Sequence, residues 1–216
     1  WNGLDNPEML KPITKPYLSA GFNSSDIDDA LNRKIVKNNY VISKDIKPKQ
    51  IAELLADGNI VAFMSDRMEF GPRSLGHRSI LADPRNINIV STINEAIKNR
   101  DFWMPFTPSI LDDYKEKYLI NPKKLDSPFM TMAFDSTDRA QKDLPAAIHN
   151  VDKTIRPQIV YEKLSPIYYQ LIKEFESITG VGALLNTSFN IHGKPIVYKP
   201  VHAIDEVLSH ELVDLK

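Results

Sequence analysis

Three arginines lie in and just after an irregular segment of the chain. Residues 69–85 read Glu-Phe-Gly-Pro-Arg-Ser-Leu-Gly-His-Arg-Ser-Ile-Leu-Ala-Asp-Pro-Arg, which places Arg73, Arg78 and Arg85 there. Two glycines and a proline predict irregular backbone. Because a guanidinium presents a planar fork that matches phosphate or carboxylate oxygens, this segment is a candidate anion site. The alternative is a turn whose arginines form surface ion pairs, which contribute little.

Two further segments carry groups that suit an anionic or amide-bearing ligand. Lys98-Asn-Arg100 ends a predicted helix, where basic residues are also favoured by the helix dipole alone. Segment 186–190, Asn-Thr-Ser-Phe-Asn, follows a predicted buried strand, and its amides and hydroxyls can hold a ribose, a phosphate or a carbamoyl group. The alternative there is a turn that satisfies its own backbone. In open α/β sheets ligands bind beyond the carboxyl ends of strands, so these segments are expected near one edge.

A fourth polar cluster contains His149, Asp152 and Arg156. His149 with Asp152 is either an acid–base pair or a structural hydrogen bond. No metal-ligand spacing surrounds His77. The sequence has neither a Walker loop nor a Gly-x-Gly-x-x-Gly fingerprint, so a nucleotide site would be of another type.

Apolar periodicity predicts helices that alternate with strands, which indicates an α/β domain with a mixed sheet. Residues 136–143 are predicted as a loop. The predicted helices are 24–33, 48–56, 86–98, 112–117, 166–179 and 200–210. The predicted strands or extended segments are 40–42, 60–64, 80–82, 105–111, 129–134, 146–151, 154–161 (interrupted at Pro157), 181–185 and 212–215.

Composition narrows the function classes. The 216 residues have a net charge of −1, so nothing global favours nucleic acid or an anionic membrane surface. No apolar run approaches the roughly 18 residues of a membrane span. The absence of cysteine excludes disulfides and cysteine nucleophiles. Residues 1–16 are rich in Pro, Asn and Lys without periodicity, so we expect a piece of a longer protein that begins in a linker.

Four ordered blocks resemble the carboxyl-terminal domain of NodU/CmcH-type O-carbamoyltransferases, and the resemblance covers about residues 48–216. The blocks are residues 68–85, residues 97–108 (Ile-Lys-Asn-Arg-Asp-Phe-Trp-Met-Pro-Phe-Thr-Pro), residues 149–158 (His-Asn-Val-Asp-Lys-Thr-Ile-Arg-Pro-Gln) and residues 184–197 (Leu-Leu-Asn-Thr-Ser-Phe-Asn-Ile-His-Gly-Lys-Pro-Ile-Val). The chain departs from the usual pattern at Met104, where many members have arginine. A phosphate contact or ion pair made by that arginine in relatives is therefore absent here.

The resemblance implies a single YrdC-like domain at residues 24–216, with a twisted mixed sheet and flanking helices. Residues 1–23 would be a linker from an absent amino-terminal domain. The implied catalytic residues are Lys98, Arg100, Ser188 and Asn190. On the chemistry of the residues themselves, the expected substrate- and nucleotide-binding residues are Arg73, Arg78, Arg156, Asn186 and Thr187, with no metal ligand in this chain.

The implied reaction forms carbamoyl adenylate from carbamoyl phosphate and ATP, with Mg²⁺ expected alongside ATP. Transfer to an acceptor hydroxyl would be completed in a kinase-like amino-terminal domain that holds an iron-type metal. We expect a cytoplasmic protein without membrane or nucleic-acid partners. The alternative functions are a non-catalytic RNA-binding module and a docking module.

Overall fold

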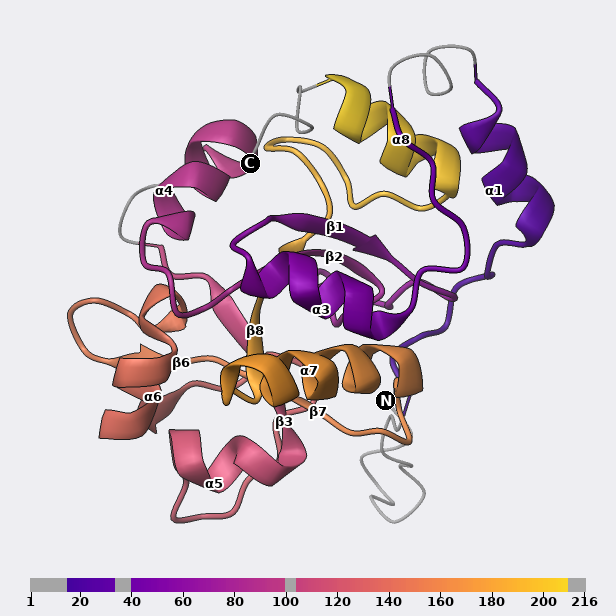
Figure 1. The fold of residues 1–216 in the computed structure, drawn as a ribbon. Helices are drawn as coiled ribbons and strands as arrows, with labels where there is room; N and C mark the ends of the chain where they lie inside the picture. Colours follow the sequence, from indigo (N-terminus) through magenta and orange to yellow (C-terminus); the bar gives the residue numbers. More distant parts are fainter. Residues whose placement is uncertain (1–14, 34–39, 100–103, 210–216) are drawn as a thin grey trace.

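A five-stranded mixed sheet lies at the centre of the computed structural model, which describes residues 15–33, 40–99 and 104–209 (Figure 1). Neighbouring strands are antiparallel except for β3 and β7, which are parallel. This confirms the predicted mixed α/β sheet. Across the sheet the strands follow the order β1 (Val61–Met64), β2 (Arg78–Ala82), β8 (Ala183–Ser188), β3 (Thr107–Leu111) and β7 (Gln158–Val160).

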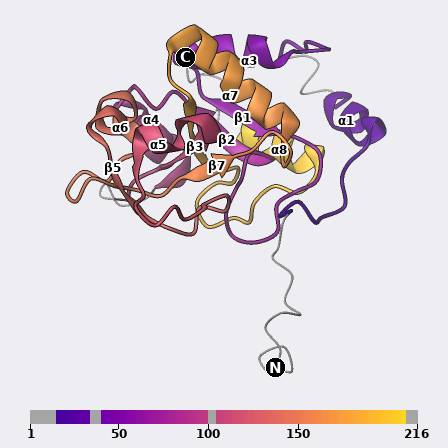
Figure 2. The same cartoon turned by 90° about the horizontal axis from the view of Figure 1, so that it is seen from below.

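Helices cover both faces of this sheet. Helices α3 (Pro48–Ala56) and α7 (Pro166–Thr179) lie side by side on one face (Figures 1 and 2). Side chains alternate along β2, so Leu81 joins the core beneath these two helices while Ile80 joins a second core. The second core is completed by α4 (Ile89–Ile93), the π-helix η2 (Asn94–Lys98) and α8 (Pro200–Ser209).

The helix ends follow their sequence signals. Pro48 and Pro166 occupy the first turns of α3 and α7, where a missing N–H costs nothing. Gly180 ends α7 in the left-handed conformation, with φ 76°. Asn23 caps α1 (Ser24–Leu31) by accepting from the backbone N–H of Asp26. The predicted bounds of α3 and α7 are thereby confirmed.

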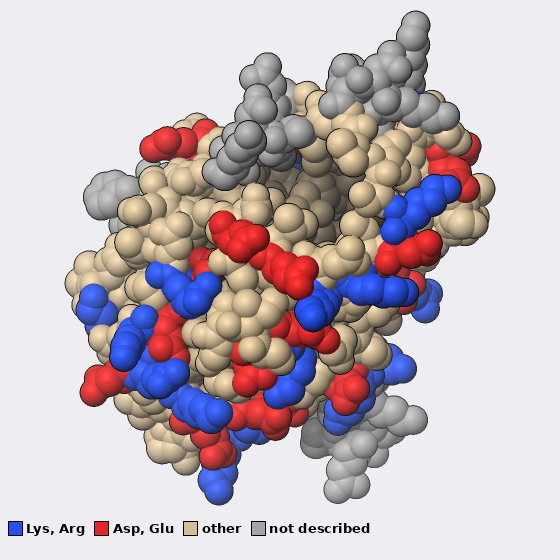
Figure 3. Space-filling view, in the orientation of Figure 1, with Lys and Arg blue, Asp and Glu red and all other residues tan. Residues whose placement is uncertain are grey.

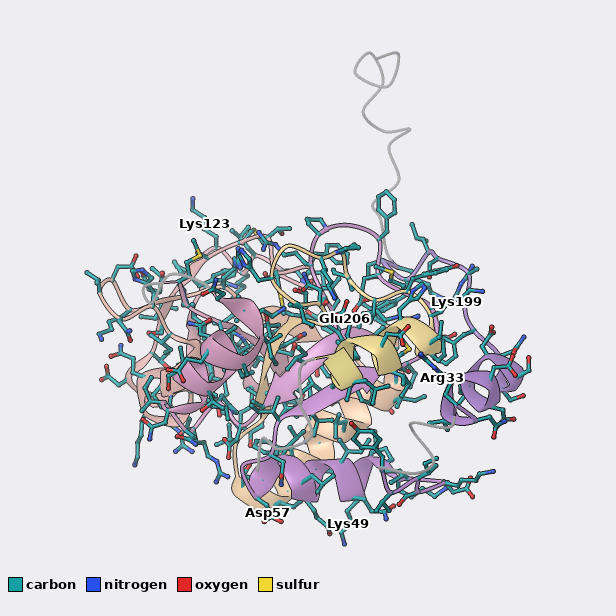
Figure 4. The ribbon with its side chains drawn as sticks, turned by 90° about the horizontal axis from the view of Figure 1, so that it is seen from above. Arg33, Lys49, Asp57, Lys123, Lys199 and Glu206 are labelled. Carbon is teal, nitrogen blue, oxygen red and sulfur yellow. The ribbon has the colours of Figure 1, made fainter. Side chains whose placement is uncertain are left out.

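Helix α1 packs against α8 at one edge of the molecule. Figure 4 shows Arg33, which follows α1, beside α8, where its guanidinium pairs with Asp205. Lys199 and Glu206 belong to the same region, and Glu206 pairs with Lys194 at 3.3 Å. Each pair has at least one well-exposed partner, so each contributes little to stability.

A second, three-stranded antiparallel sheet extends the molecule beside η3 (Asp112–Tyr114) and α5 (Lys115–Tyr118). The strands of this sheet are β4 (Leu119–Ile120), β5 (Phe134–Ser136) and β6 (Thr154–Ile155), with α6 (Asp138–Asp143) and η4 (Pro145–Ala147) between β5 and β6. The prediction of a loop at 136–143 is wrong, because Thr137 accepts from the N–H of Ala140 and starts helix α6.

Three predicted strands also need correction. Segment 129–134 becomes a strand only from residue 134, and segment 146–151 begins as a 3₁₀ turn. Residues 40–42 form no strand. The strand predicted at 212–215 lies outside the described residues. The interruption predicted at Pro157 is confirmed, since it separates β6 from β7.

Charges of both signs are interspersed over the face seen in Figure 3. Within the described part of the chain, no helix has the length and apolar character needed to cross a bilayer.

Candidate functional site

A polar cavity of about 60 Å³ lies where the loop between β1 and β2 meets the ends of β3 and β8. We call it the polar cavity. Five predicted residues from three distant segments of the chain meet there. They are Arg73, Arg156, Asn186, Thr187 and Ser188. The prediction that these segments share one edge of the sheet therefore agrees with the geometry.

Lys98 lies beside this cavity and is almost completely buried, with 2% of its surface exposed. Its Nζ donates to Ser188 Oγ at 3.2 Å, to the Asn190 carbonyl at 2.8 Å and to Asn190 Oδ1 at 2.9 Å, and it also contacts the Ser188 carbonyl. Ser188 Oγ in turn donates to Asn190 Oδ1 at 2.6 Å. Four oxygens thus surround an ammonium that has three N–H groups.

The π-helix η2 carries Lys98 into this position. One extra residue in a helical turn shifts the following side chains around the axis, and such turns are frequent at functional sites. Asn99 then ends the helix in the left-handed conformation, with φ 41°. Lys98, Ser188 and Asn190 are brought together as predicted, whereas Arg100 lies outside the described residues.

Asn186 lines the polar cavity and has an unpaired, buried side-chain oxygen. Its Nδ2 donates to Ser109 Oγ at 3.0 Å and to the Ser74 carbonyl at 3.3 Å, which fixes the orientation of the amide. The residue is fully buried, yet Oδ1 has no hydrogen-bond partner among the described residues. A buried acceptor left in this state suits a ligand that donates a hydrogen bond.

Arg78 requires a correction. It is the first residue of β2 rather than part of the loop, and it is fully buried. All five guanidinium N–H groups meet backbone carbonyls, because Nε and Nη2 donate to Tyr198, Nη2 to Asp66, and Nη1 to Ser65 and His77. Arg78, which was predicted to bind phosphate, therefore joins three chain segments and has no N–H group left for a ligand.

A carboxylate that the sequence analysis did not single out fixes the loop carrying Arg73. Glu69 is buried, and its Oε1 accepts from the backbone N–H groups of Leu75, His77 and Arg78 at 2.7, 2.8 and 3.1 Å. Three backbone donors on one carboxylate oxygen hold the loop rigid. Glu69 stood within the first block, but no local pattern indicated which N–H groups it would meet.

The Leu75 carbonyl in the same loop accepts two side-chain hydrogen bonds. Tyr17 donates its hydroxyl at 2.9 Å and Gln158 donates Nε2 at 2.8 Å. Gln158 Oε1 accepts from Ser109, whose hydroxyl also accepts from Asn186. The loop, β3, β7 and β8 are thus linked by one buried polar network that sequence reasoning missed.

His77 helps to hold this loop in place. Its Nδ1 donates to the Arg67 carbonyl at 2.7 Å, and Nε2 accepts from Ser165 Oγ at 2.9 Å. Because a carbonyl only accepts, this arrangement requires the neutral ring with its proton on Nδ1. Tyr17 stacks on the ring with centroids 3.7 Å apart. Burial lowers the pKa of His77, which favours the same neutral form.

His149 and Asp152 form a local pair away from the polar cavity. His149 Nδ1 lies 2.9 Å from Asp152 Oδ1. Hydrogen bonds from Thr154, chiefly its backbone N–H, lower the pKa of Asp152. Neither side chain lines the polar cavity, so this geometry favours the structural alternative.

A second, apolar cavity of about 420 Å³ adjoins the polar one. Four residues line both: Pro72, Arg73, Met130 and Arg156. The two arginines therefore stand at the junction between a small polar space and a larger apolar one.

Residues 52–215 match the family described as Carbamoyltransferase C-terminus. The chain belongs to this family. It is the carboxyl-terminal domain of a NodU-type carbamoyltransferase, as the four sequence blocks indicated.

Curated relatives of this carbamoyltransferase domain are longer proteins. An uncharacterized protein of Methanocaldococcus jannaschii is 40% identical over 202 residues, which are 93% of this chain and 33% of the relative. Nodulation protein NolNO of Sinorhizobium fredii is 38% identical over 74% of this chain and 24% of its own length. Nodulation protein U of Rhizobium tropici is 32% identical over 67% of this chain and 24% of its own length. The chain thus spans a quarter to a third of these relatives.

Two solved structures show that the domain has a YrdC-like fold. Full-length HypF in its phosphate- and nucleotide-bound form superposes with a TM-score of 0.54, at 18% identity, over 79% of this chain and 20% of HypF. A Sua5 variant of P. abyssi superposes with a TM-score of 0.51, at 15% identity, over 78% of this chain and 46% of Sua5. The fold prediction is thereby confirmed.

Proposed function

We propose that this carbamoyltransferase domain forms carbamoyl adenylate from carbamoyl phosphate and ATP. One observation carries the proposal: Arg73, Arg156, Asn186, Thr187 and Ser188 line one cavity. Two cationic and three hydrogen-bonding side chains around a cavity of about 60 Å³ suit a small, negatively charged reacting centre.

The proposed reaction requires no protein nucleophile. Water first cleaves carbamoyl phosphate to carbamate and inorganic phosphate. A carbamate oxygen then attacks the α-phosphorus of ATP, a new P–O bond forms, and the bond to pyrophosphate breaks. Carbamoyl adenylate and pyrophosphate result. Negative charge crowds around the α-phosphorus in this step, and fixed cations that are already in place stabilise it without reorganisation.

The residues divide into direct and indirect roles in this proposal. Arg73 and Arg156 neutralise the phosphates, while Asn186 accepts a hydrogen bond from the carbamoyl nitrogen through its unpaired Oδ1. Thr187 and Ser188 contact the nucleotide. Lys98 and Asn190 hold Ser188 in place, so Lys98 is a positioning residue here, and Arg78 stabilises the loop. Arg100 remains a predicted phosphate contact.

Mg²⁺ would enter with ATP and bind mainly through its phosphates, as this hard cation commonly does. In residues 15–33, 40–99 and 104–209, no cluster of three or more His, Cys, Asp or Glu side chains is arranged to hold a metal. An amino-terminal kinase-like domain of a longer chain, with its own iron-type metal, would complete transfer to the acceptor hydroxyl.

Calorimetric titration with ATP and Mg²⁺ tests the proposal directly. Replacing Lys98, Arg100 or Arg73 by alanine should weaken binding by about 1–3 kcal/mol, the range for a lost hydrogen bond to a charged group. Arg85→Ala is the matched control, because Arg85 pairs with Asp83 and does not line the polar cavity. Release of pyrophosphate that depends on carbamoyl phosphate would then establish the reaction.

The alternative functions give different results. Unchanged titration curves for the three variants would contradict the proposal. A folded protein that binds no nucleotide would favour the docking module. Binding of RNA with an affinity that falls steeply with salt would favour the RNA-binding module.

A further inference from the structure

The polar cavity is too small to hold a whole nucleotide. At about 60 Å³ it has room for a few water molecules, since one water needs roughly 10–15 Å³ measured in this way. A phosphate or carbamoyl group fits such a space, whereas a base and a ribose do not. If ATP binds as proposed, its nucleoside must lie elsewhere.

The adjoining apolar cavity, at about 420 Å³, falls within the usual range of small-molecule pockets. It adjoins the polar cavity, because the same two arginines line both. Leu18, Phe70, Phe129 and Met130 contribute apolar surface to it. A ligand that is anionic at one end and aromatic at the other would fit a polar cavity, two arginines and an apolar cavity that lie next to one another.

Phe70 is the most unusual of these side chains. It follows Glu69, whose carboxylate is buried under the loop, yet Phe70 itself is 75% exposed at the cavity. Its main chain is anchored, since its backbone N–H donates to the Pro16 carbonyl at 2.7 Å. An exposed aromatic ring on an anchored loop beside cationic groups is well placed to stack on a base.

We propose that the apolar cavity holds the base and ribose of the nucleotide by contact area, with little recognition of the edge of the base. This deepens the proposed function and rests on it. Apart from the two arginines, the described residues of this lining offer only the Thr131 hydroxyl and the weakly accepting Met130 sulfur for hydrogen bonds. An apolar pocket rejects a ligand of similar shape only weakly, so different bases should be accepted.

The proposal makes two measurable claims about the 216-residue protein. In the presence of Mg²⁺, ATP should bind at least about tenfold more tightly than inorganic tripolyphosphate, because base stacking on an aromatic ring has an effect of this size. GTP should bind within about fivefold of ATP, as expected for a pocket that does not read the base edge. Equilibrium dialysis or calorimetry measures all three dissociation constants.

Phe70→Ala tests the stacking contact. It should raise the dissociation constant of ATP about tenfold and leave that of tripolyphosphate unchanged. The fold should be preserved, because the ring is mostly exposed. Ile120→Ala is the control, since Ile120 is 52% exposed and lines a different hollow beside β4. It should change neither constant.

Failure of this inference is distinguishable from failure of the proposed function. Equal affinities for ATP and tripolyphosphate, or a Phe70→Ala protein that binds ATP normally, would overturn the nucleoside site while Arg73→Ala could still support the function. The cavity would then be a candidate contact for a preceding domain. Rejection of GTP by more than about 100-fold would overturn recognition by contact alone. A protein that binds neither ATP nor tripolyphosphate would overturn both proposals.

Discussion

Two groups of cations lie within the same region of this domain and differ in what surrounds them. Arg78 and Lys98 are buried, and oxygens of the protein satisfy their N–H groups. Arg73 and Arg156 instead line the polar cavity and the apolar cavity. Arg73 is exposed and makes no hydrogen bond or ion pair with any described residue. An arginine therefore serves the fold at position 78 and is available to a ligand at position 73.

This difference shows how the site separates rigidity from binding. A buried cation with carbonyl partners holds distant loops in a fixed relation, and its loss leaves those carbonyls unpaired. A cation at a cavity can be removed at little cost to the fold. Substitutions should accordingly affect stability in the first group and affinity in the second.

The largest expected effect is that of Arg78→Ala on stability. Four carbonyls, wholly or partly buried, lose their donor and a large buried side-chain volume is vacated, so we expect the free energy of unfolding to fall by more than about 3 kcal/mol. Urea unfolding measures this. Arg139→Ala serves as the control, because Arg139 is exposed and, among the described residues, forms its ion pair with Asp143, its neighbour one helical turn away. Similar unfolding midpoints for the two variants would contradict the structural role of Arg78.

Lys98 sharpens the comparison, because it is buried but contacts residues of the site. If it acts by holding Ser188 and Asn190, Lys98→Met and Asn190→Ala should not have additive effects on ATP affinity. We expect a coupling of about 1–2 kcal/mol in a double-mutant cycle, as for groups in one network. Additive losses would instead indicate that Lys98 contacts the nucleotide independently.

Arg73 should show the opposite pattern. Arg73→Lys keeps the charge but removes the planar fork, so we expect about a tenfold loss of ATP affinity, typical of one lost charged hydrogen bond. The urea midpoint should stay at the wild-type value. A lowered midpoint with normal affinity would place Arg73 among the structural cations.

The smallest expected effect is a dependence of stability on pH through His77. Its pKa is lowered by burial, so the unfolded chain binds a proton below the ordinary value of 6.5 while the folded protein stays neutral. The His77 contribution to stability should be complete above pH 6.5 and should fall as the pH drops below it.

Urea midpoints at pH 7.5 and 5.0 would check this dependence, with His77→Gln flattening it. His202→Gln is the control, because His202 is exposed on α8. An unchanged slope in His77→Gln would assign the dependence to other groups.

The sequence predicted those parts of the fold that depend on local signals. Pro166 and Gly180 gave the bounds of α7, and apolar runs gave β1, β2 and β8. The strand predicted at 146–151 failed because short apolar segments do not distinguish a strand from a 3₁₀ turn. The helix at 138–143 was missed because its cap, Thr137, was read as part of a polar loop.

The sequence predicted which residues belong to the site better than it predicted what each residue does there. Sequence blocks indicated that Arg73, Arg156 and Ser188 belong together, and they do line one cavity. Nothing in the sequence separates Arg73 from Arg78, five positions later, because only the folded chain determines which guanidinium meets carbonyls. Gln158 escaped notice because its partner, the Leu75 carbonyl, is 83 residues away in the sequence. Glu69 escaped notice because no local pattern shows which loop N–H groups its carboxylate meets.

Tyr17 sets a practical limit on how the domain can be shortened. It lies within the predicted linker 1–23, and the boundary at residue 24 stays a prediction, yet Tyr17 stacks on His77 and its hydroxyl meets Leu75. Expression from residue 24 would strip away that ring together with Leu18, which lines the apolar cavity. Shortened versions should therefore keep the chain from about residue 15, or they will test a damaged loop in place of the native one.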